Sequence, residues 1–330
     1  MPSLPPAIGD VSFRLFAGND DFPGMVRVID AASEADGIDR SITVEQARES
    51  YRHLTNCDPF TDVLVAEDPT GMVGYSRVTW RVETATNIRA MEQFGWIDAR
   101  VRGRGLGTAM LEWCEARLRE IAGGMSHDGP TEFRSWYDER ETEKHALLTD
   151  HGYTVSEVDA EMTRSLDGPT PDHPLPDGLR IVPKTIADAR EVFAADTEAF
   201  RDHVGFAEPS EEDYQDFLTG HYSKNPSLWK VAEDGEGIAG MVLNYVDEAE
   251  NEKFGRRRGW TESITTQRRW RGRGLAKALI TESMRMFKDM GMTEVALGVH
   301  TTNPTGAFQL YQGLGYEEVA RSYAVRKPFD

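Results

Sequence analysis

Apolar and polar residues alternate along this chain in an order that predicts a mixed α/β protein. Alternation with a period of two predicts strands, and apolar residues spaced three and four apart predict amphipathic helices. In the first half the expected strands are 13–16, 62–67, 72–82, 90–98, 132–137 and 155–166, and the expected helices are 25–32, 44–54, 106–121 and 141–149. The turn-forming run Asp68-Pro69-Thr70-Gly71 joins the second and third strands as a hairpin.

The same order of elements restarts after a proline-rich segment at 168–178. Its four prolines remove backbone donors and fix φ, so we expect no regular element there and place a domain boundary in it. Beyond it the expected strands are 179–182, 228–233, 238–246, 260–266, 295–300 and 316–326, and the expected helices are 186–200, 211–218, 275–290 and 304–313. The expected domains are therefore 1–167 and 179–330.

Three short runs recur in the same order in both halves, at nearly one offset. They are Val65-Ala66-Glu67-Asp68 and Val231-Ala232-Glu233-Asp234, 166 residues apart; Arg102-Gly103-Arg104-Gly105-Leu106-Gly107 and Arg271-Gly272-Arg273-Gly274-Leu275-Ala276, 169 apart; and Gly152-Tyr153 and Gly315-Tyr316, 163 apart. Because solenoid repeats have much shorter periods, this spacing predicts a duplicated domain.

Composition narrows the class of protein. A chain of 330 residues is long enough for two ordinary domains, and its 39% hydrophobic and 28% charged residues are typical of a globular protein with no membrane segment. A formal net charge of -19 argues against general nucleic-acid binding. Cys57 and Cys114 lack partners at metal-ligand spacing, so we expect no metal site and a reducing compartment. With no basic or apolar leader, we expect the protein in the cytoplasm.

The run from Gln267 to Ala276 is the strongest chemical signal in the sequence. It is a glycine-rich turn between a predicted strand and a predicted helix, where backbone N–H groups and the helix dipole favour phosphate. Seven arginines between 256 and 273 surround it, so an acidic chain concentrates positive charge at one place. A small polyanionic ligand needs such a place.

The order of hairpin, long strand, glycine turn, helix and strand, followed by Asn303, Ala307, Tyr311, Gly315 and Tyr316, resembles the GNAT superfamily of CoA-dependent N-acetyltransferases. The resemblance covers nearly the whole chain as two copies. It implies two tandem domains, each with a central, mostly antiparallel sheet flanked by helices, and acetyl-CoA as co-substrate. The tandem arrangement is similar to mycothiol synthase and related two-domain actinobacterial enzymes.

By this resemblance the turn binds the CoA diphosphate through its backbone amides, and the strand before it pairs with the pantetheine arm. The residues assigned to acetyl-CoA in the second half are Thr265, Thr266, Arg271, Gly272, Arg273, Gly274, Leu275, Ala276 and Asn303, and those in the first half are Arg102, Gly103, Arg104, Gly105 and Gly107.

Tyr311 matches the superfamily tyrosine that resembles a general acid to the CoA sulfur. On the residues alone, Ala307, Leu310, Tyr311 and Leu314 form an apolar helical stripe, so a plain core role stays open.

Glu262 is the candidate base, because many family members carry a carboxylate on the strand before the turn. Counting back from Arg271, however, places the usual position nearer Trp260, two residues earlier and on the same face, so a surface role for Glu262 stays open. His300 is the alternative base, with a structural role as its ordinary reading. For the acceptor we expect Trp260 and the loop residues Asp202, His203 and Glu208, although a solvated loop explains the last three equally well.

The first half keeps the turn but loses the rest of the motif. Aligning Gly152 on Gly315 places Leu148 at the position of Tyr311 and Arg140 at that of Asn303. Because leucine cannot donate a proton, we expect this half to be catalytically silent and retained for CoA binding or for structure.

Together these patterns predict an acetyl-CoA-dependent N-acetyltransferase, with chemistry in the second half and a small primary amine as acceptor. We expect a monomer or homodimer. Two alternatives remain: a non-catalytic CoA-sensing or assembly module, and an enzyme that acetylates a protein N-terminus or lysine.

Overall fold

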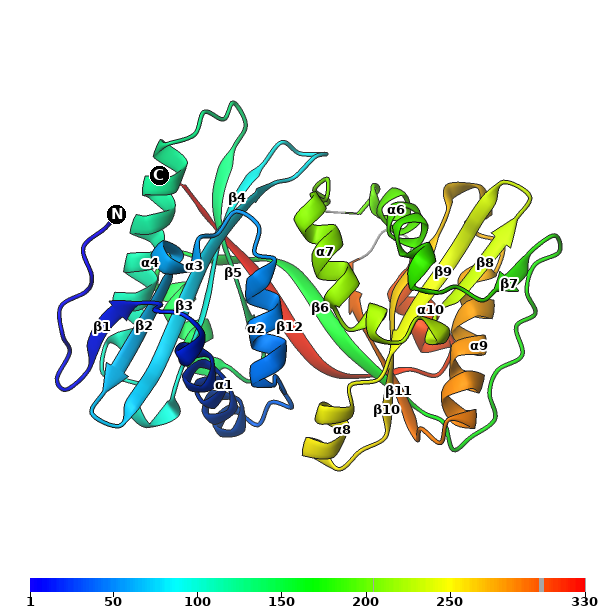
Figure 1. The fold of residues 1–330 in the computed structure, drawn as a ribbon, viewed down its shortest axis with the longest axis horizontal. Coiled ribbons are helices and arrows are strands. Elements are labelled where there is room, and N and C mark those ends of the chain that lie inside the picture. The colour runs from blue at the N-terminus through cyan, green and yellow to red at the C-terminus, as the bar shows by residue number, and fades with distance from the viewer. Residues whose placement is uncertain (204, 303–305, 330) are drawn as a thin grey trace. The chain divides into compact units, whose positions relative to one another are not determined.

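The computed structural model describes residues 1–329 apart from 204 and 303–305, and the chain forms two compact units (Figure 1). Unit 1 comprises Met1–Glu157 and Ser322–Asp330, and unit 2 comprises Val158–Arg321. Each unit holds one sheet with helices packed on its faces. In the described part of the chain, no helix is both long and apolar enough to cross a bilayer.

The sheet of unit 1 follows the expected strands closely. Its strand order is β1-β2-β3-β4-β5-β12, and all neighbours are antiparallel except β4 and β5, which are parallel. Hydroxyl groups of Thr154 and Ser156, at the start of β6, donate to carbonyls of β12. The bounds are β1 Ser12–Leu15, β2 Val63–Asp68, β3 Gly71–Val82, β4 Arg89–Ile97, β5 Thr131–Asp138, β6 Thr154–Ser165 and β12 Glu317–Pro328.

Alternation along β2 divides the core of unit 1 into two layers. Val63 and Val65 pack with helix α1, while Leu64 and Ala66 pack with helix α4 on the opposite face. The helices are α1 Phe22–Asp36, α2 Val44–Arg52, α3 Pro59–Asp62, α4 Leu106–Gly123 and α5 Thr142–Asp150.

The sheet of unit 2 repeats this plan. Its order is β6-β11-β10-β9-β8-β7, again antiparallel except for one parallel pair, β10 and β11. The strands after β6 are β7 Arg180–Val182, β8 Lys230–Asp234, β9 Gly237–Tyr245, β10 Arg258–Thr266 and β11 Glu294–His300.

The helices of unit 2 also cover both faces of their sheet. Along β9, Met241 and Leu243 pack on the face with α6 and α7, and Val242 packs on the face with α9. The helices are α6 Ala189–Phe200, α7 Glu211–Thr219, α8 Glu248–Phe254, α9 Leu275–Asp289 and α10 Ala307–Gly313. Helix α8 was not expected from the sequence, because its run of acidic residues carries little apolar periodicity.

Each parallel pair separates before its longer strand ends. The β4–β5 ladder stops at Glu92, although β4 continues to Ile97. The β10–β11 ladder stops at Trp260, although β10 continues to Thr266. The last residues of β4 and of β10 therefore keep one backbone edge without a ladder partner, immediately before the two glycine turns.

Two strands serve a different unit from the sequence half that contains them. From Val158 on, β6 belongs to unit 2, where it pairs with β11. From Ser322 on, β12 belongs to unit 1, where it pairs with β5. The sequence predicted both strands, but it assigned each to its own half.

The proline-rich segment forms no helix or strand and lies within unit 2. Arg164, Arg285 and Lys288 donate to its carbonyls at Pro169, Pro171 and Gly168. The two compact units meet along the chain inside β6 and inside β12. The boundary at 168–178 concerns the duplicated halves of the sequence and stays a prediction.

Gly259 lets β10 approach helix α9 closely, and this approach is testable. A Cβ added at Gly259 would lie 2.5 Å from Cδ1 of Phe287, a fully buried ring of α9. We expect Gly259→Ala to lower the free energy of unfolding of unit 2 by about 1–3 kcal/mol through overpacking, measured by urea denaturation. Gly235→Ala is the matched control, because nothing lies within 4 Å of its added Cβ. Equal stability of the two variants would contradict this account.

Candidate active site

The glycine turn of unit 2 presents free backbone donors at the start of α9. Gly272 and Gly274 have φ of 73° and 87°, a left-handed backbone that side chains rarely adopt, and no atom lies within 4 Å of an added Cβ at either residue. No side chain caps α9. The N–H groups of its first turn therefore face open space, as a diphosphate requires.

The turn of unit 1 has nearly the same backbone. Gly103 and Gly105 have φ of 71° and 90°, and helix α4 also begins without a side-chain cap. The sequence repeat is thus a repeat of conformation, and both turns fit a phosphate ligand.

One arginine in each unit fixes its turn to the strand before it. Nε of Arg271 donates to the carbonyl of Thr266 at 3.2 Å, and its Nη1 lies 2.7 Å from Asp202. In unit 1, Nε of Arg102 donates to Ile97 at 3.1 Å, and its Nη1 lies 2.7 Å from Asp36. Both guanidinium groups, expected on the cofactor, are engaged in anchoring the turn.

Asp202 therefore contacts the arginines of the glycine turn and does not contact the other residues that were expected to bind the acceptor. Its carboxylate also pairs with Arg268 at 2.5 Å, and the two arginines hold the pKa of Asp202 well below its usual range. Glu208 pairs with Arg201 on an exposed surface. His203 packs edge-on against Phe200, and burial, with the nearby charges of Arg271 and His300, lowers its pKa.

The arginine cluster carries less free charge than the sequence indicated. Arg269 pairs with Asp234 at 2.9 Å, and Trp270 donates to the same carboxylate. Arg273 lies over the ring of Trp270 at 5.1 Å. The turn therefore offers a ligand mainly its backbone amides, with Arg273 beside them.

The other residues expected to bind the cofactor lie in different parts of unit 2. Thr265 and Thr266 lie on the part of β10 without a partner on its β11 side, as pairing with an extended ligand requires. Leu275 is buried in the core, so only its backbone N–H is available. Ala276 follows it in the first turn of α9. Asn303 lies outside the described residues.

Strand β10 carries a bulge where its parallel partner separates. Its register against β9 shifts between Glu262 and Thr265, and Ser263 has a φ of 44°. A bulge leaves one residue unpaired and turns its backbone N–H away from the ladder. In unit 1 the β3–β4 ladder runs from Gly74–Ile97 to Val82–Arg89 without a shift.

Two carboxyl groups with raised pKa values lie at this bulge. Glu262 precedes it, accepts the N–H of Gly298 at 2.9 Å, and burial raises its pKa to about 7. Asp196 of α6 accepts the hydroxyl of Ser263 at 2.7 Å, and burial raises its pKa to about 7 also. Asp196 was not predicted from the sequence. It lies four residues after Val192 and three before Ala199, both buried, and this spacing places its carboxylate on the apolar face of the predicted helix, which is a detectable signal.

Tyr311 lies on α10 within the core of unit 2. Its side chain is 6% exposed and its ring lies 6.1 Å from that of Tyr316. Burial, followed by the neighbouring Tyr316 and Glu262, raises the pKa of Tyr311 above its usual range, so its hydroxyl stays protonated. Tyr311 is therefore part of the apolar core of unit 2 and is also near enough to Glu262 to be affected by its charge.

Three aromatic rings contact one another in series near Glu262. Trp260, two residues earlier on β10, stacks on Tyr245 at 6.1 Å and 6°. Tyr245 meets Tyr222 edge to face at 5.6 Å, and the charge of Glu262 contributes to raising the pKa of both tyrosines, after burial. The two tyrosines were not expected from the sequence, because loops and a neighbouring strand bring them here.

His300 ends β11 away from these rings. Its Nδ1 lies 3.3 Å from Asp159 and its Nε2 lies 3.1 Å from the hydroxyl of Thr302. Both ring nitrogens thus have partners, as in a structural histidine. Among the described residues, no group of three or more His, Cys, Asp or Glu side chains gathers as a metal site.

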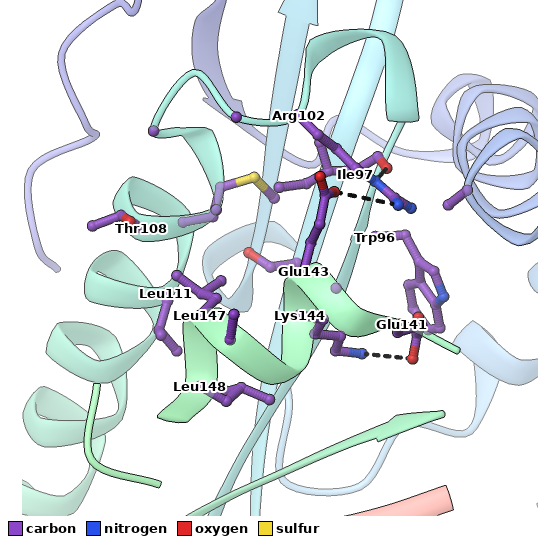
Figure 2. A pocket seen from close by; sticks show the side chains of 18 of the residues that line it. Trp96, Ile97, Arg102, Thr108, Leu111, Glu141, Glu143, Lys144, Leu147 and Leu148 are labelled. Atoms are coloured by element: carbon purple, nitrogen blue, oxygen red, sulfur yellow. Dashed lines mark hydrogen bonds and ion pairs between the residues drawn. The ribbon is translucent and has the colours of Figure 1, made fainter. Parts of the chain in front are cut away.

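In unit 1, a cavity of about 410 Å³ opens beside the turn (Figure 2). It is lined by Gly103, Gly105 and Gly107 and by the unpaired end of β4.

Leu148 lines the cavity at the position expected for an acid. Two residues of unit 1 correspond to Glu262. Gln93 lies as many positions before Arg102 as Glu262 lies before Arg271, and Phe94 holds the place in the β3–β4 ladder that Glu262 holds in the β9–β10 ladder. Neither residue is a base, in line with the expectation of a silent half.

Residues 189–316 match the model of the Acetyltransferase (GNAT) family. This segment, which lies in unit 2, is a GNAT acetyltransferase domain. A stretch of 111 residues is 28% identical to N-acetyltransferase 8F1 of Rattus norvegicus and covers 34% of this chain and 48% of that protein. The chain spans about half the length of the curated relatives it matches.

Solved structures match this protein over nearly its whole length. A GCN5-related N-acetyltransferase from Sphaerobacter thermophilus has a TM-score of 0.74 and 26% identity, covering 99% of this chain and 97% of that one. A tandem GNAT protein from the clavulanic acid biosynthesis pathway has a TM-score of 0.67 and 16% identity, covering 97% and 99%. The expected fold class, mixed α/β with tandem GNAT architecture, is confirmed.

The raised pKa of Glu262, about 7, predicts the pH dependence of this site. A base must be deprotonated, so we expect kcat/KM for amine acetylation to fall about tenfold per pH unit below about 7. Glu262→Gln should lower the rate and remove this dependence, measured as initial rates from pH 5 to 9. Asp196→Asn is the matched control and should keep it. An inflection that survives in Glu262→Gln and disappears in Asp196→Asn would assign the base to Asp196 instead.

Proposed function

We propose that unit 2 transfers the acetyl group of acetyl-CoA to the primary amine of a small molecule, by direct attack in a ternary complex. The observation that carries the proposal is the position of Glu262, with its raised pKa, at the bulge of β10, the strand that leads to the uncapped glycine turn. Family membership supports the reaction class.

The residues of this chain supply each part that amide formation needs. The amides of the turn hold the diphosphate, and the unpaired edge of β10 aligns the pantetheine arm. An N–H freed by the bulge at Ser263 donates to the oxygen of the acetyl carbonyl as negative charge develops there. Glu262 takes the proton of the attacking amine, and the hydroxyl of Tyr311 donates a proton to the departing thiolate.

The surroundings of Glu262 favour a cationic amine with an apolar body. Trp260, Tyr245 and Tyr222 offer ring faces that attract an ammonium group and cover apolar carbons. Glu262 and Asp196 add carboxyl groups, and the net charge of -19 attracts cations over a longer range. Trp260 thus stays in the proposed acceptor site, whereas Asp202 serves the turn and Glu208 lies on the surface.

Release of free thiol from acetyl-CoA, followed with a panel of polyamines, amino acids, aminoglycosides and peptides, tests the proposal. Turnover with a small amine supports it, and turnover with peptides alone would instead indicate protein acetylation. Tight CoA binding without turnover on any acceptor would favour the sensing module. The likeness to mycothiol synthase, the cytoplasmic location and the monomeric or homodimeric state stay predictions.

Tyr311→Phe tests the proposed acid. Removing only the hydroxyl keeps the ring in the core, so we expect turnover to fall by roughly 10²-fold with little change in CoA affinity. Steady-state kinetics with acetyl-CoA, and CoA titration by calorimetry, measure the two effects. Tyr316→Phe is the matched control, since it removes another buried tyrosine hydroxyl, one that contacts Thr261 at 3.2 Å. Near-normal turnover in Tyr311→Phe would remove the residue from the mechanism.

A further inference from the structure

Two carboxyl groups of the proposed acceptor site, those of Glu262 and Asp196, have no counter-charge. Among the described residues, no lysine, arginine or histidine forms an ion pair with either of them. Glu262 accepts the N–H of Gly298, and Asp196 accepts the hydroxyl of Ser263. Both residues are half-buried. A desolvated carboxylate without a cation is costly, so these groups favour a cation that comes from outside the chain.

Two other acids in this part of unit 2 are neutralised by arginines. Glu161 of β6 pairs with Arg258 at 2.7 Å. Glu250 of α8, which accepts the indole N–H of Trp260 at 3.0 Å, pairs with Arg256. The lack of a counter-charge is therefore specific to the two carboxyl groups at the bulge of β10.

Unit 1 carries a cation of its own at the corresponding place. In the β9–β10 ladder Leu243 is the partner of Glu262, whereas in the β3–β4 ladder Arg77 is the partner of Phe94. The guanidinium of Arg77 lies 4.5 Å from the ring centre of Phe94 and 5.1 Å from that of Tyr51. Unit 1 thus has an internal cation where unit 2 has a carboxyl group and an aliphatic side chain.

A buried hydroxyl beside Asp196 also lacks a partner. Thr265 is 5% exposed, and its Oγ1 makes no hydrogen bond within the described part of the chain. Burial raises the pKa of Asp196, and the hydroxyls of Ser263 and Thr265 oppose the shift, so both hydroxyls are near this carboxyl group. An ammonium carries three N–H donors and can satisfy the carboxylate and the oxygen of Thr265 together.

Aromatic rings near both carboxyl groups fit the carbon chain that joins two amines. Burial raises the pKa of Tyr222, and the charges of Glu262 and then Asp196 add to the shift, so Tyr222 is near both groups. Its ring meets that of Tyr245 edge to face at 5.6 Å. Ring faces cover methylene groups and attract ammonium groups.

We propose that the acceptor of unit 2 is a small aliphatic diamine, of which one amine reacts at Glu262 while the other, as an ammonium, binds Asp196 and Thr265. The inference rests on the proposed function and names its substrate class. The nitrogen at Glu262 attacks the thioester carbonyl, a C–N bond forms and the C–S bond breaks. Glu262 takes the proton of that nitrogen, Tyr311 gives one to the thiolate, and solvent restores both residues.

The same arrangement limits the reaction to one acetyl group per acceptor. The products are free CoA and a diamine with one amide and one amine. When the remaining amine lies at Glu262, the molecule has no ammonium left for Asp196. The monoacetylated product is therefore a poor substrate, as is a monoamine of the same length.

Thiol release from acetyl-CoA, measured at about pH 8 where both carboxyl groups are mostly ionised, tests the substrate class. Straight-chain diamines from diaminopropane to diaminohexane are compared with monoamines of equal length. We expect kcat/KM of the best diamine to exceed that of its monoamine, and of its own monoacetyl form, by roughly ten- to hundredfold, mainly through KM. Equal values for diamines and monoamines would overturn the inference and leave the proposed function standing.

Asp196→Asn tests the binding residue, because it removes the charge and keeps an oxygen that can accept the hydroxyl of Ser263. It should remove most of the preference for the diamine over the monoamine. Glu198→Gln is the matched control, since it removes the same charge from an exposed position of α6, and it should keep the preference. An equal loss of rate with both kinds of amine in Asp196→Asn would indicate a structural role and contradict the inference.

Binding separates the inference from the proposed reaction, because it needs no turnover. Calorimetric titration of the same diamines into the CoA-saturated protein should give a Kd about tenfold lower for the wild type than for Asp196→Asn. If this difference is found although no amine is acetylated, the proposed function fails and the diamine site stands. Absence of diamine binding, or the same Kd in both proteins, would overturn the inference.

Discussion

The hydrogen bond from an arginine Nε to the carbonyl that ends the preceding strand is the constraint on which both glycine turns depend. Arg271 makes it to Thr266 and Arg102 makes it to Ile97, and each arginine then reaches an aspartate from the first helical region of its unit. Strand, turn and helix are thereby fixed at one angle, so the left-handed glycines aim their amides outward instead of into the core. The arginines were expected to touch the ligand, and in the structure they hold the backbone of the turn.

The two units share the conformation of the glycine turn, but they differ in the strand before the turn and in the residue at the position of Tyr311. Unit 2 has a bulge, two carboxyl groups of raised pKa and a tyrosine, whereas unit 1 has a regular ladder, an amide or a ring, and a leucine. A single extra residue in β10 accounts for much of the difference, because it both frees a backbone donor and shifts the residues before it relative to the turn. The duplicated halves thus share the conformation of the turn and differ in the residues that precede it, while the catalytic silence of unit 1 stays a prediction.

Local patterns predicted most of the strands, the long helices and both turns, since these depend on periodicity and on glycine. They did not predict the partners of β6 and β12, because alternation defines the faces of a strand but not the edge it joins. They also did not predict the pairing of Asp202 with two arginines, nor the approach of Asp196 to Ser263, because both contacts join residues more than 60 positions apart. Glu262 was identified despite a count that pointed to Trp260. The one-residue bulge does not explain this difference of two positions, because an insertion would move the counted position farther from Arg271, and the role of Glu262 stays a prediction.

The crossing of β12 into unit 1 has a consequence for the order in which the chain folds during synthesis. Residues that complete the sheet of unit 1 beside β5 follow the whole sequence of unit 2, so this unit cannot close as soon as its own half emerges. Until then the outer edge of β5 is an unpaired strand, the kind of surface that invites pairing with another chain. The contacts that close it join residues 184 (322 − 138) to 196 (328 − 132) positions apart, a separation that slows folding. A nascent chain of this protein therefore depends on prompt completion, or on protection of that edge, in a way that two independent tandem domains would not.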